Sequence, residues 1–232
     1  MKQVRLLSVS FDTTIPAYET PAFRGAVIEK VGLEKDLFHN HNNDPDEKAG
    51  YHYRYPLIQY KRNRSRPTIV FIEEGLENAS YFFSQPNWEL TFAGKTRQLS
   101  VDTMTVRPYQ FGIDGVEHHY SIRNWIALNG DNYQKYKEMD SMIERIQLLE
   151  NILKGNMLAF ASGVKYRIPE QIEITICEMH HKKMIRVNKN KMLTFNIDFK
   201  TNIKIPPFVG LGRCSSLGFG VTRINRHVTQ KS

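Results

Sequence analysis

Two histidines separated by a single residue, His39 and His41, offer the clearest acid–base chemistry in this sequence. They open a stretch, His39 to Gly50, that is too polar to form a core. An imidazole titrates near neutral pH, so it can take a proton from one oxygen and deliver it to another. A metal half-site and a plain solvated loop are the alternatives, and no further ligand stands at a familiar metal-binding spacing. Proton transfer is therefore the interpretation we favour over a metal site and a solvated loop, both of which stay open, and no cofactor is expected.

Tyrosines and then basic residues follow the histidines. Strict alternation predicts a strand over Tyr51–Tyr60, with Tyr51, Tyr53 and Tyr55 on one face and Arg54 on the other. The tyrosines could stack on bases or bond to a phosphate, although a half-buried sheet face is an equal alternative. Beyond this strand we expect an exposed tip whose basic side chains contact phosphates, namely Lys61, Arg62, Arg64 and Arg66.

A glycine-rich segment near the C-terminus, residues 210–220, is the second chemical feature. It contains one arginine, Arg213, and four glycines, Gly210, Gly212, Gly218 and Gly220. Glycine lets the backbone approach a ligand closely, and successive amides together with an arginine suit phosphate oxygens. The pattern is neither a dinucleotide fingerprint nor a P-loop. A tight connection packed close to a sheet is the alternative to a phosphate-binding loop.

The distribution of charge favours a polyanionic partner. The formal net charge is +8, and residues 161–232 hold 13 Lys/Arg against 4 Asp/Glu. The composition, 41% hydrophobic and 24% charged, is ordinary for a globular protein. No apolar run reaches the roughly 18 residues of a membrane span, and two cysteines make no disulfide framework. A reducing, cytoplasmic setting without a membrane partner is therefore expected.

The elements of the first half predict a β-α-β-β-α-β order, which is ferredoxin-like. Their expected ranges are strands at Val4–Phe11, Tyr51–Tyr60, Thr68–Ile72 and Trp88–Phe92, and helices from Thr20-Pro21 to Gly32 and over Glu73–Phe83. Thr20 is expected to cap the first helix, with Pro21 at its first position.

The second half predicts a further unit of the same kind, with weaker evidence for its second helix. The expected ranges are strands at Glu117–Leu128, Ile172–Cys177, Met184–Val187, Met192–Phe199 and Val221–Ile224, and one long helix over Asp131–Lys154 ended by Gly155. Its stripe of Met139, Met142, Ile143, Ile146, Leu149 and Leu153 predicts a core face. The α+β fold is thus two tandem ferredoxin-like (RRM-like) domains, residues 1–95 and 96–232.

Two smaller features of the second half have several interpretations. The adjacent pairs His118-His119 and His180-His181 are each expected to supply one core and one surface histidine, because neighbouring strand residues point to opposite faces. The basic run Lys182–Lys191 predicts a hairpin that could lie in a nucleic-acid groove or be merely solvated.

Three of these features together resemble one family. Phe38-His39-Asn40-His41, the segment Tyr55–Lys61, and a glycine-rich loop ending in Gly-Phe-Gly are similar to the CRISPR repeat-processing endoribonucleases of the repeat-associated (RAMP) superfamily. The resemblance spans nearly the whole chain. It implies RNA bound along the basic faces of two ferredoxin-like domains, with the precursor CRISPR transcript cut inside each repeat.

The resemblance also implies a chemistry and partners. Cleavage would need no metal and would leave a 5′-hydroxyl and a 2′,3′-cyclic phosphate. His41 would be the base or the acid with His39 as its partner, Tyr51 or Tyr53 would orient the phosphate, and Lys61 would offset its charge. A homodimer and association with other subunits of a CRISPR effector complex are compatible with it. A non-catalytic RNA-binding RAMP subunit is the alternative function.

Overall fold

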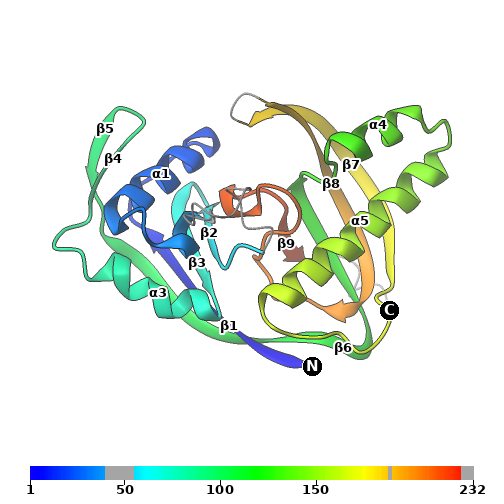
Figure 1. The fold of residues 1–232 in the computed structure, drawn as a ribbon, viewed down its shortest axis with the longest axis horizontal. Helices are drawn as coiled ribbons and strands as arrows, with labels where there is room; N and C mark the ends of the chain where they lie inside the picture. Colours follow the sequence, from blue (N-terminus) through cyan, green and yellow to red (C-terminus); the bar gives the residue numbers. More distant parts are fainter. Residues whose placement is uncertain (40–54, 188–189, 226–232) are drawn as a thin grey trace, which may run out of the picture.

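Two α/β units share one strand in this computed structural model, which describes residues 1–39, 55–187 and 190–225 (Figure 1). The first unit contains β1 (Lys2–Phe11), η1 (Ala17–Glu19), α1 (Thr20–Val31), α2 (Asp36–His39), β2 (Ile58–Asn63), β3 (Arg66–Ile72), α3 (Glu74–Phe83), β4 (Glu89–Phe92) and β5 (Lys95–Gln98). The shared strand is β6 (Val101–Trp125). The second unit contains α4 (Gly130–Glu138), α5 (Met142–Gly163), β7 (Ile174–Val187), β8 (Asn190–Lys204), η2 (Ser215–Leu217) and β9 (Val221–Ile224).

The first unit has the ferredoxin-like strand order β2-β3-β1-β6, with every neighbouring pair antiparallel. Its fourth strand is β6 and not the expected Trp88–Phe92. That segment instead forms a separate two-stranded sheet, in which β4 pairs with β5. A strand does form there, as predicted, but a β-rich run does not say which partner the strand pairs with.

The second unit repeats this order as β9-β6-β8-β7. The helix that would precede the last strand is replaced by the glycine-rich segment, which contains only the single turn η2. This confirms the two tandem ferredoxin-like units and explains why sequence evidence for that helix was weak. The basic run Lys182–Lys191 is indeed the end of the β7–β8 hairpin, where Val187 pairs with Asn190.

The two units are joined covalently and through one continuous sheet. Residues 101–111 of β6 pair with β1, and the strand then bends and pairs with β8 from Gly112 onward. Gly112 and Gly115 have φ of 131° and 75°, a region of backbone conformation that residues other than glycine avoid. The division expected between residues 95 and 96 falls inside β5 and stays a prediction, whereas the pairing of β6 changes at Gly112.

The sheet of the first unit is buried on both faces. Leu7, Val9 and Phe11 of β1 pack into a core with α1 and α3, whereas Val4 and Leu6 join the core around α5. This alternation follows from the period of two in a strand. Phe160 of α5 is fully buried in this second core and meets the rings of Tyr55 and Phe111 edge-on, at centroid distances of 4.9 and 4.7 Å. The seam between the units is therefore a hydrophobic core.

Three sequence-based boundaries need correction. Thr20 is the first residue of α1 and Glu19 is its N-cap, because the turn η1 leads directly into the helix. The strand expected over Tyr51–Tyr60 begins only at Ile58, and residues 51–54 lie outside the described residues. A single strand, β7, takes the place of the two strands that were expected at Ile172–Cys177 and Met184–Val187.

The long helix expected over Asp131–Lys154 is two helices. Ser141 caps α5 by accepting from the amide of Glu144, which ends the connection from α4. α5 runs through Gly155 to Gly163, so that glycine does not end it. Leu149 and Leu153 are buried as predicted, but Met142 and Ile143 are 54% and 68% exposed. The helical spacing of these apolar residues was predicted correctly, but the break between α4 and α5 changes which of them face the core.

Replacing Phe160 with alanine tests the seam. We expect Phe160→Ala to lower the free energy of unfolding by about 3–5 kcal/mol, since a fully buried ring leaves a cavity between the units. The matched control is Leu158→Ala, because Leu158 is 53% exposed on the same helix and should change stability by no more than about 0.5 kcal/mol. Chemical denaturation measures both. Equal losses for the two variants would contradict a packed seam.

Candidate functional site

The strand β2 contacts the glycine-rich segment and Phe38, which precedes the histidine loop. These are the two features for which the sequence predicts chemistry. Ile58 and Tyr60 point into the core with α1, whereas Gln59 and Lys61 point to the opposite face, where the glycine-rich segment lies. Figure 1 shows that segment, in orange and red, between the two units and beside β2. The strand thus contacts both chemical features through alternate residues.

The start and the end of the histidine loop are fixed beside β2. Phe38 is 1% exposed, its ring packs on Phe71, and its carbonyl accepts a hydrogen bond from the Tyr60 hydroxyl at 3.1 Å. Burial raises the pKa of that hydroxyl above its usual range, so Tyr60 stays a donor. Tyr55, where the description of the chain resumes, is also buried. Phe38 and Tyr55, the described residues on either side of the loop, are thus both parts of the buried core.

Four of the predicted site residues cannot be placed by this structure. His41, Tyr51, Tyr53 and Arg54 lie outside the described residues. His39 is the last residue of α2, and its side chain lies outside the description as well. Their roles stay predictions.

A closed hydrogen-bond network holds the glycine-rich segment to the first unit. The Tyr55 hydroxyl donates to the Gly210 carbonyl at 2.7 Å, and the Gly210 amide donates to Gln59 Oε1 at 2.9 Å. Gln59 Nε2 completes the network by donating to the Tyr55 hydroxyl at 2.7 Å. Gln59 is fully buried, so each of these polar atoms needs a partner. The network fixes the beginning of the glycine-rich segment.

Lys61 is a buried residue at the contact between β2 and the chain leading into the glycine-rich segment. The prediction that it stands at an exposed tip is wrong, because it lies within β2 and is 1% exposed. Its ammonium donates to the Phe208 carbonyl and lies 5.2 Å from the centre of the Phe208 ring. Burial, helped by the positive charge of Arg223, lowers the pKa of Lys61 well below its usual value. The side chain therefore holds the seam together, and in this conformation it does not reach solvent.

Gly212 and Gly220 are required by close packing. Gly220 has φ of 63°, and a Cβ there would come within 1.8 Å of the Leu211 carbonyl oxygen. Gly212 has φ of 86°, and its Cβ would lie 2.6 Å from Nε1 of Trp125. The Gly220 amide is already used, since it donates to the Asn124 carbonyl. Both glycines therefore serve the tight connection that was the alternative reading of this segment.

Gly218 covers the edge of the first sheet. It has φ of 85°, and a Cβ there would lie 3.2 Å from the Tyr60 carbonyl oxygen and 3.7 Å from the Thr20 side chain. β2 is the last strand on that side of the sheet, and an uncovered edge would present unpaired backbone groups. The glycine allows a close approach to β2 beside the start of α1.

Arg213 is the exposed cation of the glycine-rich segment. Its amide donates to the Ile126 carbonyl, which fixes the backbone and leaves the guanidinium on the surface. It lines a pocket of about 250 Å³ together with Lys191 of the β7–β8 hairpin and Tyr133 of α4. The hairpin also exposes Lys182, Lys183 and Arg186. Arg213 of the glycine-rich segment and Lys191 of the hairpin thus bring two cations to one pocket.

The basic tip after β2 is real but smaller than predicted. Arg64 and Ser65 form a two-residue hairpin loop with φ of 47° and 72°, between paired Asn63 and Arg66. Arg64 is exposed, and Arg62 is exposed while donating to the Ile15 carbonyl at 3.3 Å. Arg66 is ion-paired with Asp102. Arg62 and Arg64 can therefore meet a phosphate.

A group of potential metal ligands lies elsewhere. Glu178, His180 and Asp198, on β7 and β8, have ligand atoms within 4.8 Å of one another. His180 is already paired through both ring nitrogens, with Glu178 at 3.1 Å and Asp198 at 2.9 Å, and Asp198 also pairs with Arg123. These strands belong to the second unit, away from β2 (Figure 1). The three residues are thus in ion-pair contact among themselves and with Arg123.

Gln59 and Phe208 are the site residues that sequence reasoning missed. The sequence held one signal for Gln59, because it is an uncharged polar residue between Ile58 and Tyr60, two large apolar or aromatic residues. Its partner is a backbone amide more than 150 residues away, and no spacing rule reaches that far.

In the described part of the chain, no helix is long and apolar enough to cross a bilayer.

A pH titration of stability tests the buried state of Lys61. Because the folded pKa lies below the usual 10.5, the unfolded chain binds more protons between the two values, and the free energy of unfolding should rise with pH in that window. Lys61→Met should remove a slope of at most about 1.4 kcal/mol per pH unit, which in the wild type ends near the usual pKa of 10.5. The exposed Lys95→Met is the control and should keep the slope. An identical slope in the wild type and in Lys61→Met would contradict the lowered pKa of the buried Lys61 side chain.

Comparisons with known proteins agree with this architecture. The family model of the Cas6b N-terminal domain matches residues 2–110, and that of the Cas6b C-terminal domain matches residues 112–224. The two matches meet where β6 changes partner. An uncharacterized protein of Methanocaldococcus jannaschii is 32% identical over 133 residues, which cover 57% of this chain and 89% of that protein.

Solved structures share the fold. A crystal structure of Cas6b superposes with a TM-score of 0.84 and 24% identity, covering 97% of this chain and 100% of that chain. A structure described as CRISPR RNA processing endoribonuclease Cas6b gives a TM-score of 0.72 and 22% identity over the same shares. Both domain matches, in the order and with the strand pairing described above, show that this chain belongs to the Cas6b family.

Proposed function

We propose that this chain is an endoribonuclease that cuts precursor CRISPR RNA within its repeats. The observation that carries the proposal is the convergence on β2, where the start of the histidine loop and the glycine-rich segment are held by Tyr60, Gln59 and Lys61. Membership of the Cas6b family supports it, and one structural relative is described as a CRISPR RNA processing endoribonuclease.

The chemistry that fits these residues uses the RNA's own hydroxyl. A base removes the proton from a ribose 2′-OH, whose oxygen attacks the adjacent phosphorus, and an acid protonates the departing 5′-oxygen. The products are a 5′-hydroxyl and a 2′,3′-cyclic phosphate. Because the nucleophile comes from the substrate, no metal-bound water and no cofactor are needed. Histidines suit both proton transfers at neutral pH.

We assign the roles as follows. His41 is the principal acid or base and His39 its partner, and Tyr51 or Tyr53 orients the scissile phosphate. Lys61 acts from behind the site by holding Phe208, since its ammonium is buried. The described residues on either side of this loop, Phe38 and Tyr55, are both held by hydrogen bonds, to Tyr60 and to Gly210.

RNA contacts fall to exposed cations around this point. Arg54, Arg62 and Arg64 would contact the backbone near the first unit, and Arg213 with the hairpin lysines would contact it near the second. Gly210, Gly218 and Gly220 shape the segment that presents Arg213, because their amides donate to groups of the protein itself. The Gly212 amide donates to no group within the described residues and can serve a phosphate oxygen.

A deoxyribose substitution tests the proposed nucleophile. In excess EDTA, a labelled repeat transcript should be cut once and leave a 5′-hydroxyl that a kinase can label. A transcript with 2′-deoxyribose on the 5′ side of the scissile phosphate should be bound equally well and not cut. Cutting of the deoxy transcript would show that water attacks instead. Binding of both transcripts without any cut would favour a non-catalytic RAMP subunit.

Substitution of the loop histidines tests their roles. His41→Ala should lower the single-turnover cleavage rate by about 10²- to 10⁴-fold, because a positioned acid or base contributes that much, and RNA affinity should change little. His39→Ala should give a smaller loss within the same experiment. Asn40→Ala and His181→Ala, the latter exposed on β7, are the controls and should cut normally. A His41→Ala protein that cuts at the wild-type rate would remove His41 from the mechanism.

A further inference from the structure

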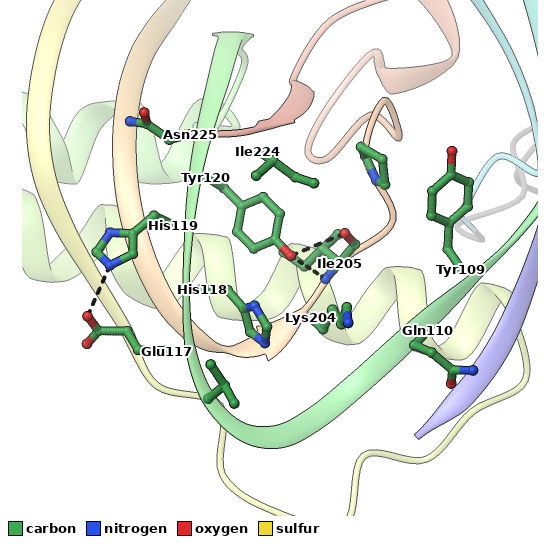
Figure 2. Close-up of a pocket in the computed structure, with 12 residues that line it drawn as sticks. Tyr109, Gln110, Glu117, His118, His119, Tyr120, Lys204, Ile205, Ile224 and Asn225 are labelled. Atoms are coloured by element: carbon green, nitrogen blue, oxygen red, sulfur yellow. Dashed lines mark hydrogen bonds and ion pairs between the residues drawn. The ribbon is translucent and has the colours of Figure 1, made fainter. Parts of the chain in front are cut away.

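A pocket of about 300 Å³ lies inside the bend of β6, apart from the glycine-rich segment (Figure 2). Figure 2 shows Tyr109 and Gln110 on one stretch of β6 and His118 to Tyr120 further along the same strand, with Lys204 and Ile205 between them. Gly112 and Gly115, at positive φ, make the bend that brings the two stretches to face each other. The pocket is therefore a product of the strand shared by the two units.

The floor of this pocket is preformed. The Tyr120 hydroxyl accepts a hydrogen bond from the Ile205 amide at 2.9 Å and donates to the Ile205 carbonyl at 3.3 Å. Tyr120 is 3% exposed, and burial raises the pKa of its hydroxyl to about 12, so it remains protonated. Pro207 and Ile224 add apolar walls. A flat apolar ligand would meet a surface that needs no rearrangement.

The acids near the pocket are neutralised by their neighbours. Asp114 Oδ1 lies 2.7 Å from His118 Nε2. Burial raises the pKa of that carboxyl, but hydrogen bonds from His118 and the Val116 amide, with the positive charges of His118 and Lys204, outweigh it and lower the pKa. Glu117 lies 3.2 Å from His119 and 3.1 Å from Lys200. The expectation of one core and one surface histidine is wrong here, since His118 and His119 are both half-buried in the lining.

Lys204 is a cation of the pocket that takes part in none of these ion pairs. It lines the pocket and forms no direct ion pair within the described residues. The rim also carries the Gln110 side chain, which is exposed and has both a donor and an acceptor. An aromatic wall at Tyr109, an apolar floor, one amide and one unpaired ammonium are what an RNA nucleotide requires: stacking, an edge contact and a phosphate contact.

We propose that this pocket binds one unpaired nucleotide of the RNA, with its base against Tyr109 and its phosphate on Lys204. The volume is at the small end of ligand sites, which suits one base and not a duplex. The inference rests on the proposed function, because it makes the substrate's single-stranded portion the ligand. It adds a contact on the shared strand, distinct from β2 and the glycine-rich segment.

Binding of short RNA to the full chain tests this assignment. The probes are fluorescein-labelled hexaadenylate and a ribose-phosphate hexamer of equal length without bases, measured by anisotropy. The wild type should bind hexaadenylate at least about tenfold more tightly, because one stacked base contributes that much. Tyr109→Ala should abolish the preference and Tyr109→Phe should retain it. Tyr18→Ala, which removes a tyrosine that is 81% exposed, should leave it unchanged.

Lys204 has its own readout. Lys204→Ala should weaken binding of both probes alike and reduce the slope of log affinity against log salt by about one, as loss of a single phosphate contact does. Lys95→Ala, an exposed lysine on the β4–β5 hairpin, is the control for general charge. A base preference that survives Tyr109→Ala, or an unchanged salt slope in Lys204→Ala, would overturn the assignment.

The cleavage assay separates this proposal from the proposed function. Normal cutting by a wild type that shows no base preference would reject only the pocket. Absence of cutting together with the expected Tyr109 and Lys204 effects would reject the nuclease and retain a nucleotide-binding pocket.

Discussion

The docking of the glycine-rich segment onto β2 is the constraint on which the rest of this structure depends. Gln59 and Lys61 are polar and buried; Gln59 accepts from the Gly210 amide and donates to the Tyr55 hydroxyl, and Lys61 donates to the Phe208 carbonyl. Removing those partners would leave a buried amide and a buried amine unpaired, which costs far more than an ordinary hydrogen bond gains. The two ferredoxin-like units are therefore fixed relative to each other by polar groups of high specificity in addition to the apolar seam around Phe160.

The same contact relates the first unit to the basic residues of the second. Phe38, at the start of the predicted histidine loop, is held to the first unit by Tyr60, whereas Arg213 and the β7–β8 hairpin belong to the second. The contact at β2, the continuous sheet through β6 and the core around Phe160 together fix how the two units sit. The buried amine of Lys61 and the hydroxyl of Tyr55 act on this geometry rather than on a phosphate, and the bend in β6 adds a separate pocket on the strand that both units share.

Local patterns were sufficient for the type and order of most elements. β-rich runs placed β1 and β3, apolar residues at helical spacing placed α1, and the duplication followed from element order. Partner choice was not local: Trp88–Phe92 found β5, and β6 became the fourth strand. Lys61 appeared to be a surface cation because it precedes Arg62 and Arg64, and only its register in β2 turns it inward. The glycines were recognised, but whether their amides faced a ligand or the protein depended on contacts more than a hundred residues away in sequence.

Hydrogen exchange at the Gly210 amide tests the seam most directly. If Gln59 and Tyr55 hold this segment as described, the amide should exchange only through the opening that also exposes the central amides of β1. Its protection should then match theirs within roughly tenfold. Exchange at Gly210 that is faster by several orders of magnitude, while β1 stays protected, would show that the glycine-rich segment is not docked and would contradict the account.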